Sequence, residues 1–121
     1  MSESEQERRV FTRIHIDCRA ELSCAQQRWP SKLLDVSLKG ALLQRPDGFD
    51  NQTKNCTLTL LLDPNGVSIT MQGQIAHLES GTVGFSCEHI DLDSIAHLRR
   101  LLALNMGDEA LLERELNELL A

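Results

Sequence analysis

Residues 13–24 read RIHIDCRAELSC, in which every second side chain from Ile14 to Cys24 is apolar or small and those between are polar. A period of two is typical of a β-strand with one face buried and the other in solvent. Further strand-like runs, separated by Gly- and Pro-containing turns, lie within 29–38, 41–44, 56–62, 67–75 and 83–87. Six strands with one apolar face each must close to bury those faces and to hide their edges. The sequence therefore predicts a mainly β fold, a six-stranded antiparallel β-barrel.

The second run, Trp29 to Leu38, predicts which side chains face the core. Leu34, Val36 and Leu38 share one phase, so we expect them to point inward. The other phase holds Asp35 and Ser37, which we expect to face outward. Gly40, just after this run, is expected to allow a sharp change of direction.

The hydrophobic period changes after Ile90, where apolar residues begin to recur every three to four positions. Helices are predicted over about 92–105 and 108–120; Asp91 or Asp93 can cap the first and Asp108 the second. We expect both to pack on a barrel that spans about 13–90, with the last helix as a candidate partner surface.

Length and charge limit the remaining possibilities. The chain has 121 residues, enough for one domain, which we expect over 8–121 after an acidic disordered tail at 1–7. Residues 8–45 hold eight Lys and Arg against three acids, so this segment is +5 and the rest of the −6 chain is −11. A local positive patch on an acidic protein favours a small anionic ligand over nucleic acid. With no apolar run of membrane-spanning length, we expect a cytoplasmic protein without a membrane partner.

The four cysteines are Cys18, Cys24, Cys56 and Cys87. Their spacing matches no Cys-x-x-Cys pair and no zinc site. Each occupies the apolar phase of a strand, so we expect small buried side chains in a reducing compartment, with disulfide or metal roles as the alternatives.

Two clusters carry the candidate chemistry. Arg8, Arg9 and Arg13 precede the first strand, and Asp35, Ser37 and Gly40 end the second; the site residues are therefore Arg8, Arg9, Arg13, Asp35, Ser37 and Gly40. An arginine fork fits both the paired acceptors of guanine and the oxygens of a phosphate. A carboxylate can accept from guanine's N1 and N2 donors. Because adjacent strands bring the clusters together, they predict a guanine-nucleotide site.

This pattern, Arg-x-x-x-Arg followed by Asp-x-Ser-x-x-Gly, resembles the PilZ family of bacterial cyclic di-GMP receptors. The resemblance implies a PilZ-type barrel with C-terminal helices, and arginines at Arg9 and Arg13 that hold the guanine and phosphate of cyclic di-GMP. Arg8 resembles the third arginine of the variant that binds two stacked dinucleotides, which makes that stoichiometry a hypothesis for this chain. Lys39, within the second motif, and His77, where some members place a ring against a base, are secondary candidates. For both, the alternative is an ordinary solvated side chain.

The resemblance implies no cofactor other than the ligand, and a receptor that changes conformation and signals to an unknown effector protein in motility, biofilm or exopolysaccharide control. We expect the segment from Arg8 to Arg13 to be mobile until ligand orders it. An enzyme is not expected, because none of the common catalytic motifs is present. The alternatives are a ligand-independent adaptor and, with only four aromatic residues for stacking, a barrel that binds single-stranded nucleic acid.

Overall fold

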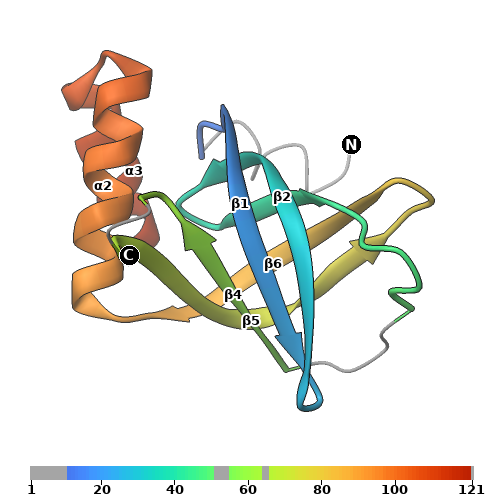
Figure 1. Ribbon diagram of the computed structural model, residues 1–121. Coiled ribbons are helices and arrows are strands. Elements are labelled where there is room, and N and C mark those ends of the chain that lie inside the picture. The colour runs from blue at the N-terminus through green and yellow to red at the C-terminus, as the bar shows by residue number, and fades with distance from the viewer. Residues whose placement is uncertain (1–10, 51–54, 64–65, 121) are drawn as a thin grey trace.

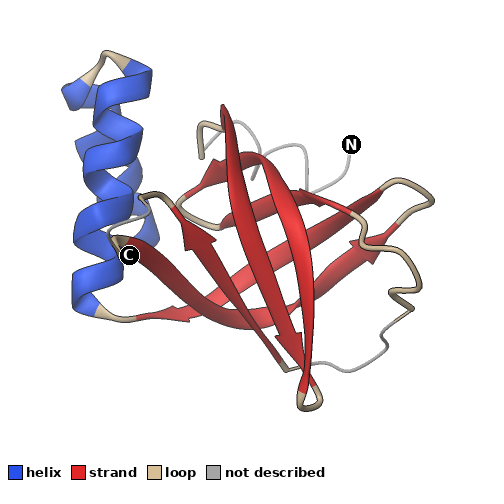
Figure 2. Cartoon of the chain, viewed as in Figure 1, coloured by secondary structure: helices blue, strands red, loops and turns tan. Residues whose placement is uncertain are grey.

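The computed structural model describes residues 11–50, 55–63 and 66–120. Within these residues the strands close into an antiparallel barrel in the order β1-β2-β3-β6-β5-β4, and the helices follow (Figures 1 and 2). The predicted fold class, a six-stranded barrel followed by C-terminal helices, is confirmed. The elements are β1 (Ile14–Cys24), β2 (Gln27–Ser37), β3 (Gly40–Gln44), β4 (Cys56–Leu61), β5 (Ser68–Leu78), β6 (Thr82–Ile90), α2 (Leu92–Met106) and α3 (Glu109–Leu120).

The core fills the inside of the barrel with aliphatic side chains from its strands. The inward positions of β4 and β5 alternate as the sequence predicts, and the fully buried side chains include Leu22, Leu33, Leu43, Leu58, Leu60, Ile69, Met71 and Val83. Both helices lie together on one side of the barrel (Figure 1). α2 packs on β5 and β1, and α3 packs on α2. Leu98, Leu102 and Leu112 extend the core between the helices and the sheet.

Both ends of α2 have a local cause. Asp91 is the N-cap, and its carboxylate accepts a hydrogen bond from the Ser94 backbone N–H at 3.0 Å. The bonds to Ser94 hold the pKa of the Asp91 carboxyl below its ordinary value. Gly107 ends the helix with a φ of 68°, the left-handed conformation that glycine adopts without strain. The Ser94 hydroxyl oxygen accepts from the Thr70 backbone N–H at 3.0 Å, so the start of α2 is bonded to β5.

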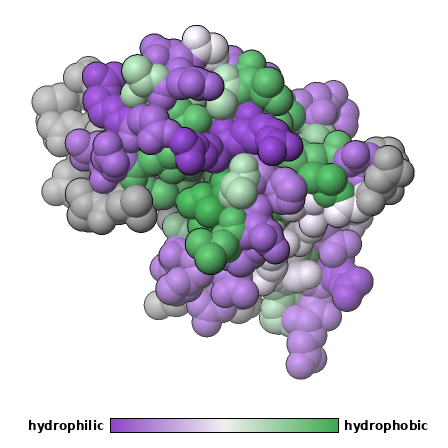
Figure 3. Space-filling model, turned by 90° about the vertical axis from the view of Figure 1, so that its left-hand side faces the viewer, coloured by the Kyte–Doolittle hydropathy of each residue, from purple (hydrophilic) through white to green (hydrophobic). Residues whose placement is uncertain are grey.

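The helices form the outer face of the molecule on their side of the barrel. This face is largely hydrophilic, with hydrophobic side chains gathered near its middle (Figure 3). A groove of about 610 Å³ runs between α2 and α3, lined by apolar residues such as Ile95 and Leu116 and by charged ones such as Arg100. Among the residues described, no helix has the length and apolar character to cross a membrane.

The predicted inward position of Leu34 is wrong. Leu33, not Leu34, lies in the core: Leu33 is 0% exposed and Leu34 is 38% exposed. The pairing of β2 with β3 skips Leu34, because Leu33 pairs with Leu43 and Asp35 pairs with the next residue, Leu42. Such a bulge inserts one residue into one strand and changes its phase. Strict alternation read from the sequence cannot detect it.

The expectation of four reduced, buried cysteines is also wrong. Cys24 and Cys56 form a disulfide, with their Cα atoms 4.6 Å apart. The cause is tertiary, since β1 pairs with β4 in a register that places these two residues opposite each other. Cys18 and Cys87 are free and half-buried. Burial raises the pKa of both thiols, and that of Cys87 reaches about 11.

Candidate ligand-binding site

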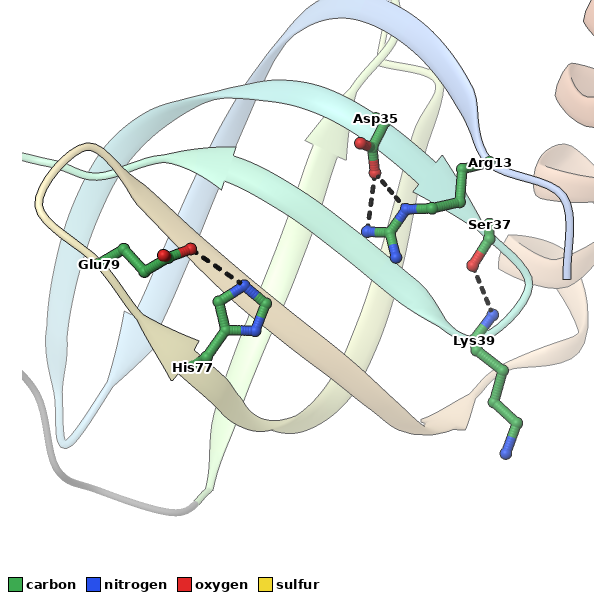
Figure 4. Close-up of polar contacts among 6 residues, drawn as sticks. All are labelled: Arg13, Asp35, Ser37, Lys39, His77 and Glu79. Carbon is green, nitrogen blue, oxygen red and sulfur yellow. Dashed lines mark hydrogen bonds and ion pairs between the residues drawn. The ribbon is translucent and has the colours of Figure 1, made fainter. Parts of the chain in front are cut away.

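The site begins with an ion pair at the open end of the β1–β2 hairpin, opposite its turn. Arg13 immediately precedes β1, and Asp35 lies opposite His15 near the end of β2. Nε and Nη2 of Arg13 donate to the same oxygen, Oδ1 of Asp35, at 2.9 and 2.8 Å. The third guanidinium nitrogen points away from Asp35 (Figure 4). The arginine side chain is 38% exposed and the aspartate side chain 10%, so a mostly buried carboxylate orients a partly exposed fork.

The bulge in β2 explains why Asp35 is placed this way. Leu33 and Val36 both point into the core, three positions apart, because Leu34 is the extra residue between them. Asp35 therefore keeps the outward phase that the sequence predicted, opposite to Val36, but at 7% exposed it is covered rather than open to solvent. Ser37 is buried as well. Bulges often redirect a side chain beside a functional site.

The turn from β2 to β3 carries Ser37, Lys39 and Gly40. The Ser37 hydroxyl accepts a hydrogen bond from the Lys39 backbone N–H at 3.2 Å, which holds the turn in place (Figure 4). The Lys39 ammonium lies 5.6 Å from the centre of the Phe11 ring, a cation–π contact. Gly40 is needed for space rather than for a change of direction, because a Cβ there would overlap the backbone carbonyl of Phe85 on β6.

His77 reaches the same region from β5. It pairs with Gly84 of β6, and its imidazole ring occupies the space that a side chain at position 84 would fill. Its Nε2 lies 3.9 Å from Oε1 of Glu79, and its side chain is half exposed. The missing side chain of Gly84 therefore lets the ring lie flat against the barrel wall. The sequence shows a glycine at position 84, but only the β5–β6 register shows that it makes room for the His77 ring.

A cavity of about 230 Å³ unites these residues: Arg13, Ser37, Lys39, Gly40 and His77 all line it. Asp35 does not line the cavity itself, but it bonds to Arg13, which does. The volume is below the roughly 300 to 1,000 Å³ of pockets for drug-sized ligands. Arg8 and Arg9 lie outside the described residues. In the described part of the chain, no three His, Cys, Asp or Glu side chains lie close enough to hold a metal ion.

A family model for the PilZ domain matches residues 7–104. The chain belongs to the PilZ domain family. PilZ domains are binding and adaptor domains of cyclic di-GMP signalling rather than catalysts, and the match includes both predicted motifs.

Solved structures show the same fold. The inhibitor of motility MotI/DgrA from Bacillus subtilis superposes with a TM-score of 0.66 at 12% identity, over 81% of this chain and 51% of that one. The present PilZ chain thus spans about half the length of the Bacillus protein. The PilZ domain of CeSA from a cellulose-synthesizing bacterium gives a TM-score of 0.60 at 17% identity, over 79% of this chain and 96% of that one.

One feature of this PilZ domain was missed by sequence reasoning. Glu115 of α3 is buried and bonded to Thr12, the residue before Arg13. The sequence indicates the burial of Glu115 only by its spacing: it lies three residues after Leu112, on the face of α3 that packs inward. A charged residue on that face needs a partner, and only the fold shows that the partner is 103 residues away.

Proposed function

We propose that this protein is a cyclic di-GMP receptor that binds its ligand at the Arg13 cavity and passes the signal to a protein partner. The observation that carries the proposal is the Arg13 fork, held by Asp35 at the edge of a cavity that Ser37, Lys39 and His77 share. An oriented guanidinium suits guanine and phosphate, the two groups that a cyclic dinucleotide repeats. Membership of the PilZ family supports this ligand over other guanine nucleotides.

Each residue of the site has a proposed role. Arg13 donates to guanine or phosphate, Asp35 orients that fork, and Ser37 with Gly40 shapes the turn beside it. Arg8 and Arg9 would supply further forks, which fits a described cavity too small for a complete dinucleotide. Lys39 adds positive charge near a phosphate, and His77 offers a ring for a base to stack on.

Ligand binding is proposed to hold the segment around Arg13 more firmly and thereby to change the surface that the helices present to an effector. The Bacillus neighbour is titled an inhibitor of motility, and the CeSA domain comes from a cellulose-synthesizing bacterium. Motility, biofilm and polysaccharide output are accordingly the processes in which we place this protein. Three arginines in the motif further suggest two stacked ligands for each chain.

Calorimetric titration with cyclic di-GMP, beside cyclic di-AMP and GTP, tests the proposal. We expect saturable binding of cyclic di-GMP, with the other two nucleotides at least about tenfold weaker because they lack either guanine edges or the paired cyclic phosphates. Saturation at one ligand for each chain would remove the stacked pair and leave the receptor. The absence of any heat at millimolar cyclic di-GMP would refute the receptor itself.

A further inference from the structure

The carboxylate of Glu115 joins the C-terminal helix to the ligand-binding motif. Its Oε1 accepts from the Thr12 backbone N–H at 2.9 Å, and its Oε2 accepts from the Thr12 hydroxyl. Glu115 is 2% exposed, although it lies on the last helix of a small domain. Thr12 directly precedes Arg13, so the contact lies one residue from the fork that Asp35 orients.

Burying a carboxylate at this position costs free energy. It loses its hydration, and the protein must replace that hydration with hydrogen bonds or bear the cost. Here both oxygens bond to the same residue, in a bidentate contact that involves the backbone as well as the side chain. Leu112, three positions earlier, is buried by packing alone. A leucine at 115 could extend the apolar face of α3, but it could not hold the Thr12 backbone in one place.

We propose that Glu115 is a positioning residue for the ligand site, and that ligand binding and the docking of α3 are coupled through Thr12. This inference rests on the proposed receptor function. Because Glu115 fixes the backbone just before Arg13, it keeps the guanidinium at Asp35 and at the cavity before ligand arrives. Pre-organisation of this kind lowers the cost of binding. By thermodynamic reciprocity, a ligand that holds Arg13 in place also stabilises α3 against the barrel.

Two nearly isosteric changes weaken the contact, each by removing one part of it. Thr12→Val removes the hydroxyl and leaves one carboxylate oxygen without its donor, while Glu115→Gln removes the charge. Coupling between sites typically amounts to 5- to 150-fold, and we expect each change to weaken cyclic di-GMP binding about tenfold. The double variant should lose less affinity than the sum of the two single losses, because both changes weaken the same contact.

Two control variants separate this effect from general damage. Thr12→Ser keeps the hydroxyl and should bind within about twofold of the wild type. Glu113→Gln lies on the same helix but is exposed and pairs with Arg99, so its affinity should not change. Circular dichroism melts give the temperature at which each variant begins to unfold, and all titrations are made below the lowest of these temperatures.

Amide hydrogen exchange of the full chain gives a readout that affinity alone does not. Cyclic di-GMP should slow exchange in residues 109–120 of the wild type, and this protection should be lost in Thr12→Val. Without ligand, Thr12→Val should already exchange faster in α3.

The outcomes distinguish the two proposals. If the wild type does not bind cyclic di-GMP, the receptor function is wrong. If it binds, and Arg13→Ala weakens it, but Thr12→Val and Glu115→Gln bind equally well or more tightly, the receptor function stands and the positioning role of Glu115 is wrong. Unchanged α3 exchange on ligand binding in the wild type would likewise overturn the coupling.

Discussion

Replacing Arg13 by alanine tests the ion pair and the ligand site together. The change removes both hydrogen bonds to Oδ1 of Asp35, at 2.9 and 2.8 Å. Asp35 remains with a side chain only 10% exposed, so its carboxylate loses its charged partner in a poorly hydrated place. Because the arginine side chain is 38% exposed, solvent already screens the pair, and we expect a loss of about 1 to 2 kcal/mol in the free energy of unfolding.

The expected effects on melting and on affinity follow from general magnitudes. A domain of this size unfolds with an entropy of about 0.25 kcal/mol/K, so the melting temperature should fall by roughly 4 to 8 °C. The loss of one fork to guanine costs about 1 to 3 kcal/mol, which is roughly a five- to 150-fold weaker affinity for cyclic di-GMP. Calorimetric titration and thermal melts of the same samples measure both quantities.

Two further variants sharpen this test. Arg13→Lys keeps the charge but loses the planar fork, so it should bind nearly as weakly as Arg13→Ala. Arg28→Ala removes an exposed arginine of β2 and should change neither quantity. If Arg13→Ala binds cyclic di-GMP within about twofold of the wild type while it stays folded, Arg13 does not contact the ligand. If Arg13→Lys binds as the wild type does, charge alone suffices and the argument from fork geometry is wrong.

Three other measurements test the structure more generally. The disulfide between Cys24 and Cys56 closes a loop across 32 residues of sequence, so Cys24→Ser should lower stability by about 3 to 4 kcal/mol in chemical denaturation, and equal melts in the presence and absence of reductant would contradict the bond. Burial raises the pKa of the Cys87 thiol to about 11, so its alkylation should be slow at pH 8 and accelerate as the pH rises toward that value; a fast rate at pH 8, followed by mass spectrometry, would contradict this burial. Ala25 and Gln26 turn the β1–β2 hairpin with φ of 52° and 70°, so Asn-Gly at these positions should raise the melting temperature, and a lower one would show that the turn is not strained.

The strands and helices could be predicted because each depends on nearby residues. The alternation of residues 13–24 gives β1 a buried and an exposed face whatever it pairs with. Asp91 and Gly107 act within one turn of α2, through a cap bond and a left-handed residue. The proximity of Arg13 and Asp35 was also predictable, since they lie at the facing ends of two consecutive antiparallel strands.

Other features depend on how distant segments align, and for these the tertiary structure was needed. The register of β1 against β4 sets Cys24 opposite Cys56, and the bulge at Leu34 places Asp35 on the face opposite to the inward Val36. The docking of α3 brings a carboxylate to Thr12. A local pattern reports which face of an element is apolar, because that depends on a fixed period along the chain. It does not report which residue of another element lies opposite, because that register is set by the packing of the whole barrel.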